Sequence, residues 1–139
     1  MDILECIRSR RSVRSFTDQE LTYDEIMELI DLGICAPTGQ YRQRQMCIRD
    51  RVIVFGDKSS PWYIEDSCCL AQNMILAGFS KGIGSCWIGF GQEIFNREDF
   101  KKEYNIPESY VSVAPLILGY MGSKPKPPKR KEALIFSKR

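Results

Sequence analysis

Apolar residues are spaced along this chain in two ways, and the spacing predicts where helices and strands lie. Apolar positions three and four residues apart predict helices within residues 2–9, 21–37, 64–81 and 96–107, whereas short β-branched and apolar runs predict strands at 52–55, 85–90 and 110–121. Strands and helices therefore alternate, which indicates a mixed α/β or α+β fold with few strands for its length.

The ends of the predicted helices carry recognisable signals. Thr22 and Glu25 have the spacing of a capping box, and Pro37 stops the helix that they begin. The helix at 64–81 is apolar around most of its circumference and ends at Gly82. We therefore expect this helix to lie at the centre of the fold, covered on several sides.

The last segment of the chain differs in composition from the rest. Residues 123–139 hold seven basic residues, one acidic residue and three prolines, which predicts an extended basic arm. We therefore expect one domain at residues 1–122 followed by this arm. The apolar run at 133–136 favours burial of the arm against a partner surface.

Composition removes several classes of chemistry. The 139 residues include no histidine, so the commonest general base and metal ligand is missing. The six cysteines show no Cys-x-x-Cys spacing, and we interpret them as reduced thiols, with no metal site expected. No apolar run is long enough for a membrane span or a secretory signal, which predicts a cytoplasmic protein. An organic cofactor is then the expected source of any demanding chemistry.

Two basic clusters lie near the two ends of a chain whose net charge is only +2. The first is "RSRRSVRSF" (8–16), and the second lies at 126–131. Each could complement a helix dipole or simply be solvated, and together they could bind nucleic acid. Serines between arginines add hydroxyl donors to guanidinium forks, however, and this compact arrangement suits one dianionic phosphate better than a long polyanion.

The glycines of "GIGSCWIG" (82–89) do not indicate a dinucleotide-binding loop. A dinucleotide fingerprint follows a strand and opens a helix, whereas this stretch follows a predicted helix and opens a predicted strand. The order excludes a dinucleotide-binding fold. We interpret the glycines as positions where the backbone could approach a flat ligand closely.

Four pieces of sequence, taken in order, resemble the FMN-dependent nitroreductase family. They are "RSRRSVRSF", the helix ending in "APTG" (36–39), the apolar helix followed by "GIGSCWIG", and "APLILGY" (114–120) ahead of a Lys/Pro-rich tail. Together they extend over residues 2 to about 131, apart from 44–51. The resemblance implies an α+β three-layer sandwich, with a central, mostly antiparallel sheet flanked by helices, and an intertwined homodimer with two FMN sites at its interface.

The resemblance also implies which residues contact FMN, and it implies no catalytic side chain because the flavin carries the chemistry. Residues near the two ends of the chain would hold the phosphate and the ribityl chain: Arg10, Arg11, Ser12, Lys129 and Arg130. Others would lie near the ring, three of them reaching it from the partner subunit: Arg14, Gln43, Trp87, Ile88 and Gly89, with Pro37, Thr38 and Gly39 from the partner. A cation at Arg14 would stabilise the negative charge of the reduced ring.

The function implied by this likeness is a ping-pong oxidoreductase. NADH or NADPH would reduce the flavin, and a small nitroaromatic or quinone-like acceptor would then take the electrons. Neither nucleic acid nor a membrane is an expected partner of such an enzyme. Two alternatives stay open: an FMN-binding or interaction module without turnover, and a small nucleic-acid-binding protein that uses both basic clusters.

The chain departs from the family pattern after Pro37. Tyr41 stands where the family has asparagine, and Arg44 and Gln45 replace a Pro-Trp pair. The strand and the helices that normally follow are expected to be missing, as an internal deletion around residues 44–51, and loss of a central strand would leave its neighbours unpaired. The join "MCIRDR" (46–51) resembles translated adapter sequence, which indicates an assembly deletion rather than an evolved loop.

Overall fold

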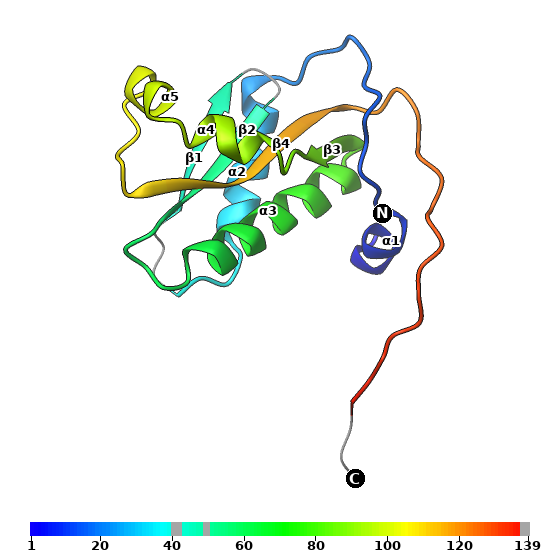
Figure 1. The fold of residues 1–139 in the computed structure, drawn as a ribbon. Helices are drawn as coiled ribbons and strands as arrows, with labels where there is room; N and C mark the ends of the chain where they lie inside the picture. The colour runs from blue at the N-terminus through cyan, green and yellow to red at the C-terminus, as the bar shows by residue number, and fades with distance from the viewer. Residues whose placement is uncertain (40–42, 49–50, 137–139) are drawn as a thin grey trace.

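The computed structural model describes residues 1–39, 43–48 and 51–136. Five helices and four strands follow one another in these residues (Figure 1): α1 (Ile3–Ser9), α2 (Tyr23–Ile34), β1 (Gln43–Ile48), β2 (Arg51–Asp57), α3 (Tyr63–Ser80), β3 (Ile83–Trp87), α4 (Gly91–Phe95), α5 (Glu98–Glu103) and β4 (Tyr110–Tyr120). The strands form one sheet in the order β1-β2-β4-β3, and every neighbouring pair is antiparallel. This arrangement agrees with the α+β class and the antiparallel sheet expected from the sequence.

Helices α2 and α3 cover one face of the sheet. Their apolar side chains pack against alternate residues of the two central strands, among them Val52 and Val54 of β2 and Leu116 of β4. Eight residues of α3 are buried, so the expectation of a central helix covered on several sides is confirmed. The main core therefore lies between this helix pair and the sheet.

Helix α4 lies on the opposite face of the sheet (Figure 1). Its Ile94 and Phe95 line a small apolar cavity together with Ile53 and Ile117, which occupy the strand positions between those that face α2 and α3. Successive side chains of a strand point to opposite faces. The strand β2 is consequently buried on both sides, as the run "VIVF" predicts.

The end signals in the sequence act as predicted. Helix α1 has a further cap, because Asp2 accepts a hydrogen bond from the Glu5 N–H at 2.8 Å. Thr22 and Glu25 form the reciprocal capping box of α2. After α3, Gly82 adopts a φ of 83°, a left-handed conformation that suits glycine, and the chain turns there into β3.

Two predicted elements in the second half have different limits. The strand expected at 85–90 begins earlier, at Ile83, and ends at Trp87, because the chain turns into α4 just beyond it. The helix expected from Asn96 starts at Glu98. The side chain of Asn96 is engaged elsewhere, since its Oδ1 accepts a hydrogen bond from the Ser112 N–H at 2.7 Å.

The structure contains one strand that the sequence did not predict, close to the expected deletion. Residues 43–48 form β1, which pairs in register with β2 from Gln43 opposite Gly56 to Ile48 opposite Arg51. No helix separates the two strands, because only residues 49 and 50 lie between them. The backbone of β2 is thus paired on both sides despite the short connection, and the expected exposure of its edge does not occur.

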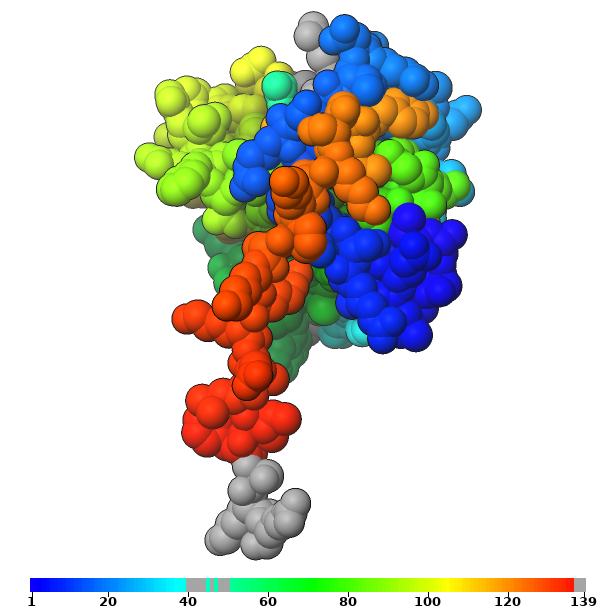
Figure 2. Space-filling model, turned by 90° about the vertical axis from the view of Figure 1, so that its right-hand side faces the viewer, coloured from blue at the N-terminus to red at the C-terminus, as the bar shows by residue number. Residues whose placement is uncertain are grey.

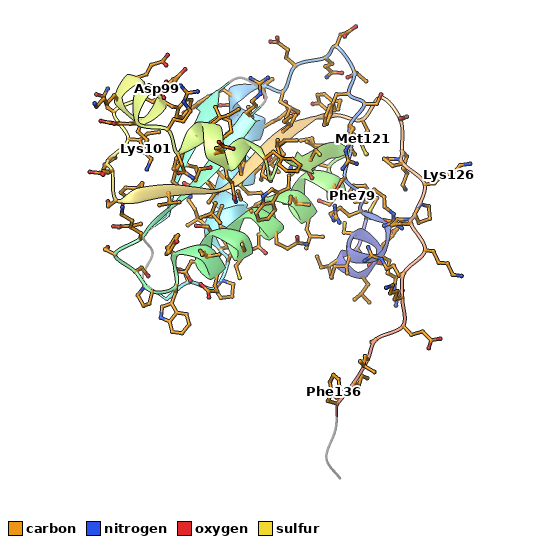
Figure 3. The ribbon with its side chains drawn as sticks, viewed as in Figure 1. Phe79, Asp99, Lys101, Met121, Lys126 and Phe136 are labelled. Atoms are coloured by element: carbon orange, nitrogen blue, oxygen red, sulfur yellow. The ribbon has the colours of Figure 1, made fainter. Side chains whose placement is uncertain are left out.

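The arm has no helix or strand in residues 123–136, the part of it that the structure describes. Leu134, Ile135 and Phe136 are 80%, 79% and 91% exposed, and Phe136 lies away from the body of the protein (Figure 3). The division into a domain at 1–122 and an arm stays a prediction. Among the described residues, no helix has the length and apolarity that a bilayer crossing requires.

Candidate functional site

The amino-terminal arginines lie on a segment that runs beside the sheet. Arg10 caps the end of α1, and residues 11–16 then follow β3 and the end of β4. The N–H of Val13 donates to the carbonyl of Ser85 at 2.8 Å, and Ser12 and Ser85 form a parallel bridge. These backbone contacts fix the direction of the arginine-bearing segment.

The glycine stretch makes room for this segment. A Cβ on Gly84 would lie within 2.9 Å of the Val13 side chain, so a larger residue would force the segment away from β3. Gly89, by contrast, has open space where a Cβ would lie, with no atom within 4 Å among the described residues. The close packing at Gly84 is therefore against the protein's own chain, and the expected approach of this glycine stretch to a flat ligand stays a prediction.

Three arginines from the two ends of the chain gather at this segment. Burial lowers the pKa of Arg10, and the positive charges of Arg11 and Arg130 lower it further. Nη1 of Arg11 donates to the carbonyls of Arg8, at 2.9 Å, and Arg10, at 2.6 Å. The buried Nε of Arg11 has no hydrogen-bond partner in the described part of the chain. The cluster therefore combines repelling like charges with an unsatisfied donor.

The arm reaches the cluster because its first residues are tied to the body. The N–H of Gly122 donates to the carbonyl of Ser15 at 2.9 Å, and Nζ of Lys124 lies 5.7 Å from the centroid of the Phe79 ring. From there the arm runs along the same side of the molecule as α1 (Figures 1 and 2). Lys129 is exposed and is not among the charges that lower the pKa of Arg10.

Two other predicted residues of the amino-terminal segment are also exposed. Ser12 and Arg14 lie on the same extended stretch as Arg11, on either side of the buried Val13. Their side chains are accessible to a ligand held at the cluster. The structure thus brings together Arg10, Arg11 and Arg130, with Ser12 and Arg14 beside them.

The loop at Pro37–Gly39 is held by a buried carboxylate. Oγ1 of Thr38 donates to Oδ2 of Asp66 at 2.7 Å, and the N–H of Gly39 lies 3.1 Å from both carboxylate oxygens. Asp66 belongs to the first turn of α3 and is only 7% exposed. Sequence reasoning did not single out Asp66. The available signal was an acidic residue inside a helix that is apolar around most of its circumference.

The loop and the arginine cluster lie at opposite ends of α3 (Figure 1). The loop contacts Asp66 at the start of the helix, whereas the arm contacts Phe79 near its end. Thirteen residues at 1.5 Å each place these two points about 20 Å apart. Within one chain, therefore, the loop residues are not brought to the arginines.

The residues at the end of β3 and just beyond it lie on opposite faces of the sheet. The side chain of Trp87, at the end of β3, is partly buried and packs against the core between the sheet and α2 and α3. Its expected place at the flavin ring stays a prediction. Ile88 lies on the other side, where it lines an apolar cavity of about 150 Å³ beneath α4. Its N–H donates to the carbonyl of Pro115 at 2.9 Å. The roles expected for Ile88 and Gly89 at a bound ring stay predictions.

Gln43 completes the set of predicted site residues. Its backbone pairs with Gly56 at the start of β1, but its side chain lies outside the described part of the structure. In the described ranges, no three His, Cys, Asp or Glu side chains gather in a way that could hold a metal ion. The positively charged groups of the candidate site are the guanidinium groups of Arg10, Arg11 and Arg130, which suit an anionic ligand.

Comparison with known proteins identifies the fold and the family. A model of the nitroreductase family matches residues 50–120, just over half of the 139-residue chain. A Methanothermobacter thermautotrophicus protein, provisionally named an NADH dehydrogenase/NAD(P)H nitroreductase, is 27% identical over 153 aligned positions, which cover 90% of this chain and 80% of the relative. Because 153 exceeds 139, the alignment includes positions at which this chain has no residue. This agrees with the expected internal shortening.

Solved structures show the same architecture. A nitroreductase with bound FMN from Bacteroides fragilis NCTC 9343 superposes with a TM-score of 0.85 at 21% identity, over 100% of both chains. The NfrA1 nitroreductase from B. subtilis superposes with a TM-score of 0.82 at 20% identity, over 93% of this chain and 70% of that chain. These similarities confirm the nitroreductase-like fold expected from the sequence. Together with the match of the family model, they establish that this chain belongs to the nitroreductase family.

Proposed function

We propose that this protein is an FMN-dependent oxidoreductase that passes electrons from NADH or NADPH to a nitroaromatic or quinone-like acceptor in ping-pong order. The observation that carries the proposal is the convergence of Arg10, Arg11 and Arg130 from opposite ends of the chain. The FMN bound in the Bacteroides fragilis nitroreductase and the name of the M. thermautotrophicus relative support it. A cytoplasmic location is part of the same proposal.

The cluster fits a phosphate group. Like charges at close range repel one another, and none of the described acidic residues forms an ion pair with Arg10. A dianion placed among them would remove the repulsion and accept bidentate hydrogen bonds from the guanidinium groups. The unsatisfied Nε of Arg11 is a further donor at the same place. Arg10, Arg11, Ser12 and Arg130 would hold the FMN phosphate, with Lys129 near it.

The remaining residues would orient the ring. Bound FMN supplies the hydride and electron transfer, so the chain's own task is to bind, position and shield it. Ile88 and Gly89 would offer an apolar, closely approachable surface to one face of the ring. Arg14, on the exposed side of the same segment, would place a positive charge where negative charge develops on reduction. Gln43 and the side of Trp87 left uncovered by the core would lie at the ring's margin.

We further propose that a homodimer forms and completes the site. Pro37, Thr38 and Gly39 lie at the far end of α3 from the arginines of their own chain, so they would reach FMN in the site of the partner subunit. The exposed apolar end of the arm would be covered in the same assembly. One FMN site would then be shared by two chains.

The second candidate function, an FMN-binding module without turnover, has an observation in its favour. Strand β1 leads into β2 with only two residues between them. Helices at this place would supply a wall of the substrate pocket, and any such wall is missing from this chain. The arginine cluster lies elsewhere and is independent of that connection. Cofactor binding could therefore persist without a pocket for the acceptor.

Spectroscopy of the purified full chain separates the two candidates. We expect a yellow protein whose 1:1 FMN complex loses its visible absorbance when NADH or NADPH is added without oxygen and regains it on addition of a nitroaromatic. A yellow protein that neither nucleotide bleaches would support the module without turnover. A chain that binds no FMN at micromolar concentration would overturn the proposed function.

A further inference from the structure

We infer that Asp66 is a positioning residue, which fixes the loop at Pro37–Gly39 in the form that meets the flavin. The inference rests on the proposed function, because it assigns the loop a ligand. Its geometric basis is independent of that function. The carboxylate accepts hydrogen bonds from the Thr38 hydroxyl at 2.7 Å and from the Gly39 N–H at 3.1 Å, across 28 and 27 residues of sequence.

Because Asp66 is buried, its hydrogen bonds to the loop are required and specific. A carboxylate that is 7% exposed has lost most of its hydration and needs hydrogen-bond donors in compensation. The donors come from the loop, so the loop must keep its conformation for the carboxylate to stay satisfied. An apolar residue at this position of α3 would fill the core equally well without holding the loop.

A second contact from the same helix end restricts the loop from another side. A Cβ added to Gly39 would lie 3.0 Å from Cδ1 of Trp62, so the loop backbone lies directly on the indole ring. Trp62 is the residue before α3 and is 54% exposed. The loop is thus held between a carboxylate and an aromatic ring, and its conformation is set before a ligand arrives. Such preorganisation lowers the entropic cost of binding.

A matched pair of substitutions separates positioning from simple stabilisation. Thr38→Val keeps the side-chain shape and removes the donor to Asp66. Thr22→Val also removes a threonine–carboxylate hydrogen bond, that between Thr22 Oγ1 and Glu25 Oε2 at 2.8 Å, but at the start of α2 rather than in the loop. Both variants lose stability, whereas only the first changes the flavin-facing loop. Thr38→Ser restores the donor and serves as the rescue.

The experiment is an FMN titration of the full-length variants, followed by flavin fluorescence, with thermal unfolding measured in parallel. We expect Thr38→Val to raise the Kd of FMN about tenfold, as loss of a charge-assisted hydrogen bond predicts, and Thr38→Ser to return the Kd to within about twofold of wild type. Thr22→Val should lower Tm and leave the Kd within about twofold. We also expect the visible band of bound FMN to shift in Thr38→Val and not in Thr22→Val.

Each remaining outcome overturns a stated claim. Equal FMN affinity in Thr38→Val and wild type would overturn the inference and leave the proposed function standing. An equal loss of affinity in Thr22→Val would show that general destabilisation is responsible, and it would overturn the inference as well. Failure of the wild-type chain itself to bind FMN would overturn the proposed function, and the role of Asp66 toward flavin with it.

Discussion

Arg10 is the residue on which the proposed anion site depends most. Burial lowers its pKa, and the positive charges of both Arg11 and Arg130 lower it further. A charge-assisted hydrogen bond contributes about 1.5–3 kcal/mol, roughly one to two factors of ten in Kd. We predict that Arg10→Ala weakens FMN binding about 10- to 100-fold, which isothermal titration calorimetry at fixed ionic strength measures directly.

The control for this substitution is another arginine with a carboxylate partner far from the cluster. Arg97 pairs with Asp99 on the exposed surface at α5, so Arg97→Ala changes the net charge by the same amount. Its FMN affinity should stay within about twofold of wild type, since exposed ion pairs and distant charges are screened. Equal losses in both variants would mean that net charge, not the site, governs binding.

At the scale of elements, the amino-terminal segment and β3 depend on each other through Gly84. A methyl group there would lie within 2.9 Å of Val13, a fully buried side chain that cannot move freely. We predict that Gly84→Ala lowers the free energy of unfolding by about 1–3 kcal/mol and weakens FMN binding, because the segment bearing Arg10, Arg11 and Arg14 moves away from the sheet. Urea unfolding and FMN titration check the two effects.

Gly89 provides the comparison within the same stretch of sequence. Its surroundings are open, so Gly89→Ala should change the free energy of unfolding by less than about 0.5 kcal/mol. If both alanines were equally tolerated, the close packing between Val13 and Gly84 would not be what holds the segment.

A second link between elements joins α2 to β4 and depends on pH. The hydroxyl of Tyr120 donates to Glu25, and this bond, with those from Thr22, holds the pKa of the Glu25 carboxyl below its ordinary value. The same bond raises the pKa of Tyr120. A depressed carboxyl pKa stabilises the folded state above the unfolded value of about 4.3, and this stability is lost as the pH falls through the folded value.

We therefore predict that Tyr120→Phe is less stable than wild type at pH 6–7 and that the difference shrinks as the pH falls below about 4. The measurement is urea unfolding of both proteins from pH 3 to pH 7. A constant difference across the whole range would show that the Tyr120–Glu25 bond has no part in the acid transition.

Elements with local signals were predictable, and those that depend on distant partners were not. The capping box at Thr22 and the glycine after α3 identify their helix ends without any tertiary information. Strand β1, "QRQMCI", lacks the alternation of a half-buried strand and forms because β2 offers its edge for backbone pairing. Helix α4 has five residues and no side-chain cap, so no local sequence pattern predicted it.

The candidate site shows the same division. The motif around Arg10 indicated a phosphate, but its meeting with Arg130 depends on the path of the arm, which composition alone cannot specify. The role of Asp66 was not predictable, since its partner residues lie 27 and 28 positions away in sequence. Trp87 packs partly on the core because its place in β3 directs its side chain toward α2 and α3, a contact that the sequence did not indicate, and its expected place at the ligand stays a prediction.

At the scale of the whole molecule, the separation between the loop and the arginine cluster decides whether one chain or two build the site. About 20 Å of α3 lies between them, so a site that uses both must take them from different subunits of a symmetric dimer. This makes mixing of two defective variants informative. A chain with Arg10→Ala lacks the cluster, and a chain with Thr38→Val lacks the fixed loop.

In a mixed dimer of these two chains, one site receives both defects and the other receives neither. Random assembly of equal amounts makes about half of the dimers mixed, so about a quarter of all sites should bind FMN with wild-type affinity. We predict this fraction of tight sites in a titration of the two variants refolded together, and none when they are refolded separately and then combined at low temperature. If each site were built within one chain, every site would carry one defect, and refolding the variants together would restore no tight FMN binding. That result would mean that the loop at Pro37–Gly39 has only a structural role.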